Sequence, residues 1–201
     1  MGYSGHAYVV ADAALLNGFQ LAGYLDTEEK EMNPYGIPFL GSEDTIESKQ
    51  LDKNSLFFPA VGSNALRRKF CAYLKDKNLN EGLLIHPRAV VSAQAALQKS
   101  TFVSALAIVQ ARASIGRGCI INTGAIVEHE CIIGDFAHIA PGAVLAGNVT
   151  VGNNTIIGAG TIVREGIRIG SGVVIGAGSL VLKDIPDAET WYGHPASRKK
   201  A

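Results

Sequence analysis

Residues 120–149 read IINTGA-IVEHEC-IIGDFA-HIAPGA-VLAGNV, five hexads that each place Ile, Val or Leu second. The same phase runs from Leu84 to Ile185 without an insertion and makes seventeen hexads, all with an aliphatic second residue. A fixed period is the signature of a repeat architecture, and six is neither the period of a helix nor that of a simple strand. Each hexad therefore predicts one short strand followed by one turn.

Three hexads make one triangular coil of 18 residues, so the run predicts a parallel β-helix of about six coils. Side chains of a strand alternate between its faces. The aliphatic second residue and the small sixth residue should therefore point into the prism. Third-place and fifth-place glycines are expected to supply positive φ angles at the corners. Those singled out are Gly116, Gly134, Gly152, Gly158, Gly170 and Gly176.

The first residue of each hexad faces outward, and sorting these residues by prism side gives two apolar sides and one mixed side. The sides are Leu84, Phe102, Ile120, His138, Ile156 and Val174; then Val90, Ile108, Ile126, Val144, Ile162 and Leu180; then Ala96, Ser114, Ile132, Thr150 and Arg168. Long exposed apolar stripes are typical of interaction surfaces. The pattern predicts a cyclic homotrimer, unless β-branched residues are present only because they favour strands.

Residues 1–83 are expected to form a separate, small, Rossmann-like α/β subdomain, and residues 186–201 a C-terminal cap and tail. The expected elements of the subdomain are a helix at 6–17, strands at 19–26 and 55–61, and a helix at 65–76 capped by Asn64. Alternation of strands and helices favours a parallel sheet. A glycine turn at residues 2–6 leads into the first helix, whose N-terminus favours phosphate.

Such a turn normally follows a strand, and only Met1 precedes it, so either the first strand is missing from this sequence or the sheet is one strand short. Asp26 comes at the end of the next expected strand, about twenty residues on, where an acidic residue suits a ribose or sugar hydroxyl. The alternative for Asp26 is a plain turn residue.

Two histidines lie inside the repeat. His129 takes a corner place between Glu128 and Glu130, and an imidazole with an acidic neighbour is a natural general base. His138 follows half a coil later, so the two should meet only across an interface between subunits. Its alternative role is a histidine satisfied by a backbone carbonyl. Their spacing does not match a zinc site, and no metal is expected.

Composition excludes several classes of function. Eighteen basic residues balance eighteen acidic ones, so no overall charge favours nucleic acid or an anionic membrane. No apolar run is long enough to span a membrane, and no signal peptide is visible. Three cysteines, Cys71, Cys119 and Cys131, fit reduced thiols and a cytoplasmic location.

The segment from Asn122 to His138 and the segment AGNVTVG at 146–152 resemble those of bacterial nucleotide-sugar acetyltransferases of the hexapeptide-repeat family. The Ser-Gly-His turn, Tyr-Leu-Asp, Ala-Val-Gly-Ser-Asn-x-x-Arg and Gly-His-Pro-Ala extend this resemblance over nearly the whole chain. It is most similar to the UDP-4-amino-sugar N-acetyltransferases of the bacillosamine-pathway type, and then to sialic-acid O-acetyltransferases.

The resemblance implies a left-handed β-helix, acetyl-CoA as co-substrate, a nucleotide-sugar acceptor and direct transfer in bacterial surface-glycan biosynthesis. His129 would be the general base and Glu130 its orienting carboxylate, while Asn122 would position the amino sugar. The implied acetyl-CoA contacts are His138, Gly147, Ala159 and Ala177. The implied nucleotide-sugar contacts are Ser4, Gly5, His6, Asp26, Thr27 and Gly62.

Two alternatives stay open at this point. A sialic-acid-type O-acetyltransferase would use the same base and donor, since a hydroxyl and an amine ask for the same proton acceptor. A non-catalytic, trimeric sugar-binding protein would keep the prism but would have no use for the His129–Glu130 pair.

Overall fold

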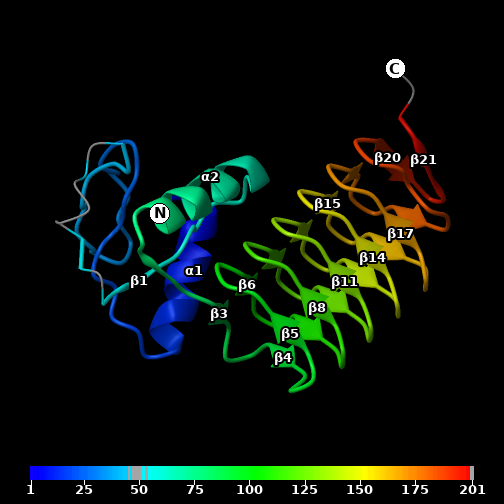
Figure 1. The fold of residues 1–201 in the computed structure, drawn as a ribbon, viewed down its shortest axis with the longest axis horizontal. Coiled ribbons are helices and arrows are strands. Elements are labelled where there is room, and N and C mark those ends of the chain that lie inside the picture. Colours follow the sequence, from blue (N-terminus) through cyan, green and yellow to red (C-terminus); the bar gives the residue numbers. More distant parts are fainter. Residues whose placement is uncertain (45, 47–50, 53, 200–201) are drawn as a thin grey trace.

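The computed structural model describes residues 1–44, 46, 51–52 and 54–199, and it consists of an N-terminal region beside a parallel β-solenoid (Figure 1). Within these residues the solenoid has about six turns, each built from two-residue strands. Strands 18 residues apart pair in parallel, for example Ile126 with Val144. The predicted hexad phase is therefore the observed strand phase.

The strands of the solenoid form three sheets, one for each side of the prism. Sheet 1 contains β3 (Leu84–Ile85), β6 (Phe102–Val103), β9 (Ile120–Ile121), β12 (His138–Ile139), β15 (Ile156–Ile157), β18 (Val174–Ile175), β20 (Thr190–Gly193) and β21 (Ala196–Arg198). Sheet 2 contains β4 (Val90–Val91), β7 (Ile108–Val109), β10 (Ile126–Val127), β13 (Val144–Leu145), β16 (Ile162–Val163) and β19 (Leu180–Val181). Sheet 3 contains β5 (Ala96–Leu97), β8 (Ser114–Ile115), β11 (Ile132–Ile133), β14 (Thr150–Val151) and β17 (Arg168–Ile169).

The core of the prism is built from the second and sixth residues of the hexads, as predicted. Second-place residues such as Ile121, Val127 and Ile139 are fully buried, and sixth-place residues such as Cys131 and Ala143 are buried beside them. Each buried aliphatic side chain contributes roughly 1.5–3 kcal/mol. The central coils therefore gain the most from this core, because in the first coil Ile85, Val91 and Leu97 are only partly buried.

The prediction that third-place glycines supply positive φ angles is wrong. Positive φ occurs at the fifth place, at glycines such as Gly124 and Gly160 and at non-glycine residues such as Glu130. Third-place glycines are needed for a different reason, because the next coil passes close by. A β-carbon at Gly152 would lie 2.5 Å from the carbonyl carbon of Gly170, closer than real packing allows.

In its described residues the N-terminal region contains two helices, α1 (Gly5–Leu16) and α2 (Asn64–Asp76). Neither helix in the described part of the chain is long and apolar enough to cross a membrane. The N-cap of α2 is Ser63, whose side chain accepts a hydrogen bond from the Leu66 amide. The prediction of Asn64 as the cap is wrong by one residue, since Asn64 already lies in the first turn.

The expected strands of the N-terminal region are shorter than predicted. β1 (Leu56–Phe57) pairs with β2 (Asn80–Glu81), and a single bridge joins Tyr24 to Phe39. Residues 19–23, which belonged to a predicted strand, have no regular structure. The parallel sheet is therefore present only in fragments.

One apolar side of the prism is covered by the N-terminal region of the same chain. Leu84, Phe102 and Ile120 are at most 5% exposed and pack with Tyr3 and residues of α1. The prediction that this stripe faces a second subunit is therefore wrong for its first three residues. The stripe on sheet 2 stays open, with Val90 63% exposed.

The last coil is closed by the C-terminal segment. β20 extends sheet 1 by pairing with β18, and β21 turns back on it. The Trp191 side chain is buried against the end of the core. Residues 200–201 of the predicted tail lie outside the described residues.

Candidate active site

His129 lies at the corner that joins sheet 2 to sheet 3, in the turn between β10 and β11. Its imidazole is 55% exposed, and Nδ1 lies 3.5 Å from a carboxylate oxygen of Glu130. The other oxygen of Glu130 lies 3.7 Å from Arg112 Nε. The carboxylate thus faces one ring nitrogen, and an imidazolium formed during a reaction would have a negative charge beside it.

The imidazole of His129 rests on Gly147, the residue one coil later at the same corner. A β-carbon added to Gly147 would lie 2.6 Å from Nε2 and 3.1 Å from Nδ1. Only glycine leaves room for the ring in this position. Gly147 therefore makes room for the His129 ring, in addition to the contact with acetyl-CoA that the family resemblance implies for it.

His138 begins β12 on the outer face of sheet 1, and its partner is Asn122. Asn122 Nδ2 lies 3.1 Å from His138 Nε2, while Asn122 Oδ1 accepts a hydrogen bond from the Thr123 amide. Because an amide nitrogen can only donate, Nε2 of His138 must accept. The proton of the neutral ring is then on Nδ1.

Burial lowers the pKa of His138 to about 4, and the charges of Arg67 and His6 add to this shift. Burial and Arg67 together lower the pKa of His6 to about 4 as well. Both rings are therefore neutral at pH 7. His6 Nε2 is a buried atom without a hydrogen-bond partner in the described residues, which is unusual for a buried polar atom.

Arg67 joins the N-terminal region to the solenoid. The residue is 1% exposed, and its guanidinium donates hydrogen bonds to uncharged groups alone within the described part of the chain. The acceptors are the carbonyls of Gly118, Phe136, Val61 and Gly62 and the Oδ1 of Asn64. Among the described residues this buried cation has no carboxylate partner, so its charge adds to the effect of burial in keeping both histidines unprotonated.

The predicted sugar and donor residues fall into separate groups within one chain. His6, Asn122 and His138 come together around Arg67, on the side of sheet 1. His129, Glu130 and Gly147 lie at the corner between sheets 2 and 3. Ala159 and Ala177 are exposed at the corner that follows sheet 1, one coil apart.

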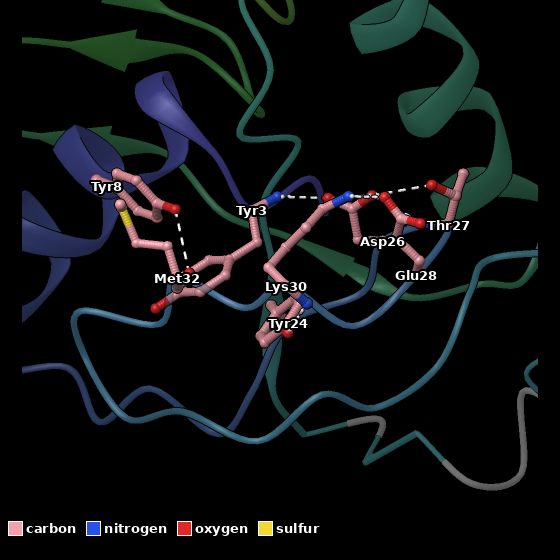
Figure 2. A network of polar contacts seen from close by, with 8 residues as sticks. All are labelled: Tyr3, Tyr8, Tyr24, Asp26, Thr27, Glu28, Lys30 and Met32. Atoms are coloured by element: carbon pink, nitrogen blue, oxygen red, sulfur yellow. Dashed lines mark hydrogen bonds and ion pairs between the residues drawn. The ribbon is translucent and has the colours of Figure 1, made fainter.

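Asp26 holds the glycine turn in front of α1 (Figure 2). Its Oδ2 accepts a hydrogen bond from the Tyr3 amide, its Oδ1 accepts one from the Thr27 amide, and Lys30 lies 3.2 Å away. Burial would raise its pKa, but these hydrogen bonds outweigh burial and the net pKa is lowered. The carboxylate is thus ionised and already engaged with the turn.

The turn itself is open to a ligand. Ser4 is the N-cap of α1, but its side chain makes no capping hydrogen bond, and Ser4, Gly5 and Gly62 are exposed. No acidic residue lies in the first turn of the helix. The free amides and the positive end of the helix dipole suit an anionic group such as a phosphate.

The cysteines do not serve as nucleophiles. Cys119 and Cys131 are fully buried inside the prism, and burial raises the pKa of Cys119 to about 12. A thiol in this state is inert. Within the described residues no group of three or more His, Cys, Asp or Glu side chains is placed to hold a metal ion.

Sequence reasoning assigned no role to Arg67 or Arg112. Arg67 could have been found from helical spacing, because it shares the buried face of α2 with Asn64, Phe70 and Leu74. A charged residue on an apolar helix face is unusual. Arg112 could have been found from the period, because it lies 18 residues before Glu130 and therefore one coil away at the same corner.

Two family models match the chain. The PglD N-terminal domain matches residues 1–74. The bacterial transferase hexapeptide model of six repeats matches residues 112–147 and 148–183. No curated protein matches significantly.

Solved structures match over almost the whole chain. The acetyltransferase domain of PglB from Neisseria gonorrhoeae, in complex with acetyl coenzyme A, is 36% identical with a TM-score of 0.93, covering 98% of this chain and 96% of that one. PerB from Caulobacter crescentus, in complex with CoA and GDP-perosamine, is 35% identical with a TM-score of 0.93, covering 99% and 95%. WeeI from Acinetobacter baumannii, at 21% identity and a TM-score of 0.89 over 98% and 97%, shares the fold.

Proposed function

We propose a reaction from the premise that this chain belongs to the family of hexapeptide-repeat acetyltransferases that includes PerB and the PglB domain. As a member it is an acetyl-CoA-dependent sugar N-acetyltransferase. The acceptor is a nucleotide-linked 4-amino-4,6-dideoxy sugar, with UDP as the nucleotide, in bacterial surface-glycan biosynthesis. The observation that carries the chemistry is the exposed His129 ring, seated on Gly147 with Glu130 at its Nδ1.

In the proposed reaction the neutral sugar amine attacks the carbonyl carbon of acetyl-CoA while His129 Nε2 takes the amine proton. The imidazolium is stabilised by Glu130, 3.5 Å from Nδ1. As the tetrahedral intermediate collapses, the C–S bond breaks and the proton passes to the CoA thiolate. The products are the N-acetylated sugar and CoA, without an acyl-enzyme.

The proposed assembly is a homotrimer of left-handed prisms, because each half of the site lies on a different part of the chain. His129 lies at the corner beside the open stripe of sheet 2, where Ile162 is 47% exposed. His138 and Asn122 lie on the side of sheet 1, and His6 lies in α1, which packs on that side. A neighbouring subunit that covers the stripe would bring its sheet 1 group to His129, with Ala159 and Ala177 along the same groove.

The sugar nucleotide is proposed to bind at the turn before α1, with Ser4, Gly5 and Gly62 around its phosphates and with Asp26 and Thr27 beside its ribose. His6, in the first turn of α1, is proposed to contact the same ligand. We place the enzyme in the cytoplasm because its three cysteines are free thiols, which suit a reducing compartment.

The function is tested by a thiol-release assay with acetyl-CoA against UDP-, GDP- and dTDP-linked 4-amino sugars and against free sialic acid. Turnover is expected with the UDP-linked amine. The His129→Ala variant should lose at least about 100-fold in kcat, while Glu128→Ala, one residue away, should keep most of its activity. Transfer to sialic acid alone, or near-normal turnover by His129→Ala, would show that the proposal is wrong.

The shared site is tested by mixing two inactive variants, His129→Ala and His138→Ala, after reversible dissociation. If each site takes His129 from one subunit and His138 from the next, random mixing restores about a quarter of the sites. If each chain carries a complete site, the mixture stays inactive.

A further inference from the structure

The imidazole of His129 lies beside two carboxylates. Glu130 Oε2 is 3.5 Å from Nδ1 of the ring, and Glu128 Oε2 accepts a hydrogen bond from the His129 amide at 3.4 Å. A nearby negative charge stabilises the imidazolium relative to the neutral imidazole. A general base must be neutral before it can take a proton. The two carboxylates alone would therefore keep this ring in its inactive form up to a higher pH.

Arg112 carries the charge that opposes this effect. Its Nε lies 3.7 Å from Glu130 Oε1, the oxygen that does not face His129. Each oxygen of the carboxylate thus has a different partner. Residues 110–112 and 146–148 form the same corner in the coils before and after, and among these described residues Arg112 alone is charged. No other charge from the adjacent coils at this corner therefore acts on the ring.

The backbone of the solenoid determines where Arg112 and Glu130 lie. Both take the fifth place of their hexads, 18 residues apart, and both have a positive φ, +63° and +62°. The Glu130 amide donates a hydrogen bond to the Ala111 carbonyl, which fixes the two corners in register at a coil spacing of about 4.8 Å. Because the backbone conformation is the same, the two side chains leave the corner one above the other.

The ion pair of Arg112 and Glu130 has little value for folding. The Arg112 side chain is 75% exposed and the Glu130 side chain 46%, and exposed ion pairs contribute little to stability. The consequence of the contact therefore lies in what it does to the carboxylate. With one oxygen turned to Arg112, Glu130 presents only the other to His129, and part of its negative charge is offset.

We propose that Arg112 is a positioning residue for the base, which acts through Glu130 to keep the His129 imidazole neutral at the pH of the reaction. The inference rests on the proposed function, in which His129 takes the proton of the amine. Without Arg112, both oxygens of Glu130 would be free to turn to the ring and the protonated ring would be favoured. For an exposed ion pair the expected change is about half a pH unit.

The test is the pH dependence of kcat/KM for acetyl transfer by Arg112→Met. The rate should rise with pH as the base loses its proton, and the midpoint of this rise should move up by about 0.5 pH unit. Well below the midpoint kcat/KM should be about threefold lower than in the native protein, whereas above about pH 8.5 the two should converge. The urea midpoint of unfolding should be unchanged, which a purely structural role would not allow.

Three variants serve as comparisons. Arg112→Lys keeps the charge and should restore the native midpoint. Glu130→Gln removes the carboxylate and should move the midpoint in the opposite direction, to lower pH. Arg168→Met removes an exposed cation from sheet 3, so it changes the net charge equally and should leave the midpoint in place.

A double-mutant cycle shows whether Arg112 acts through Glu130. In a Glu130→Gln background, Arg112→Met should move the midpoint by less than about 0.2 pH unit at 0.15 M salt, because only the screened direct effect of the charge on the ring is left. If Arg112 instead contacts the phosphates of a substrate, its loss would raise KM in both backgrounds and leave the midpoint where it is. That result would overturn the inference.

An NMR titration of the His129 ring in the ligand-free protein gives a readout that does not depend on turnover. Arg112→Met should raise the midpoint of this titration by the same 0.5 pH unit, about the worth of one exposed ion pair. Near-normal turnover by His129→Ala would overturn the proposed function, and the inference with it. An inactive His129→Ala, together with unmoved NMR and kinetic midpoints in Arg112→Met, would overturn this inference alone.

Discussion

Gly147→Ala should impair catalysis by moving a ring that the mutation itself does not replace. The new β-carbon would stand 2.6 Å from His129 Nε2, and ordinary contact begins at 3.4 Å. The ring must therefore retreat by at least 0.8 Å. A misplacement of about 1 Å in a catalytic group costs roughly 100-fold, or about 2.7 kcal/mol in activation free energy.

The same substitution should barely change stability. Gly147 has no positive φ, so alanine fits its backbone, and the His129 ring is exposed enough to move aside. The assay is kcat from CoA release at saturating substrates, with unfolding by urea in parallel. Glu165→Ala, an exposed residue at the same corner one coil further on, is the matched control and should retain full activity.

A double-mutant cycle shows whether the effect passes through His129. In a His129→Ala background the added methyl group has no ring to displace, so Gly147→Ala should cost nothing more. If Gly147 acted instead by contacting acetyl-CoA, its substitution would lower activity in both backgrounds. A kcat within twofold of the native value for Gly147→Ala alone would refute the reasoning.

Three further predictions concern stability. His6 and His138, with pKa values lowered to about 4, bind protons more readily in the unfolded chain, so the free energy of unfolding should fall as the pH drops below 6.5. Each histidine should lower it by about 2 kcal/mol at pH 4.5. If His138→Asn leaves the pH dependence of the unfolding free energy unchanged, this prediction is wrong. Gly152→Ala should lower the free energy of unfolding by about 2–3 kcal/mol, because the new β-carbon overpacks against the next coil. Gly160→Ala should lower it by only about 1 kcal/mol, because Gly160 has open space around it and a φ of +65°. The reverse order in urea unfolding would show that close approach is not what requires glycine at the third place. Arg67→Met should cost roughly 3–5 kcal/mol, because it leaves buried carbonyls without donors, and a loss under 1 kcal/mol would argue against its joining role.

The solenoid could be predicted from the sequence because each of its strands is determined by residues that are close together in the chain. Each hexad specifies its own strand and corner, and pairing with the residue 18 positions later follows from the period alone, as with Ile126 and Val144. The resemblance to nucleotide-sugar acetyltransferases is likewise confirmed by the solved relatives. The N-terminal strands were harder, because their pairing joins residues as distant as Gly2 and Leu25 or Met1 and Ala60.

The candidate site was only half visible in the sequence. The pair His129–Glu130 adjoins in the chain and could be recognised, and its geometry agrees with the predicted pairing. The group of His6, Asn122 and His138 around Arg67 could not be recognised in this way, because its residues come from α1, α2 and three different coils. An outward apolar residue such as Phe102 also looks the same whether its cover is another subunit or, as here, its own chain.

The 18-residue register makes the height of the prism adjustable in whole steps. Removing residues 156–173 would join Thr155 to Val174 in phase, and β12 would pair with β18 in place of β15. The cap built on Trp191 would remain in place, and so would everything that rests on β3, β6 and β9. Evolution can therefore lengthen or shorten the far end by about 4.8 Å at a time. The end that packs against the N-terminal region can meanwhile stay as it is, so under the proposed function donor and acceptor preferences can diverge independently.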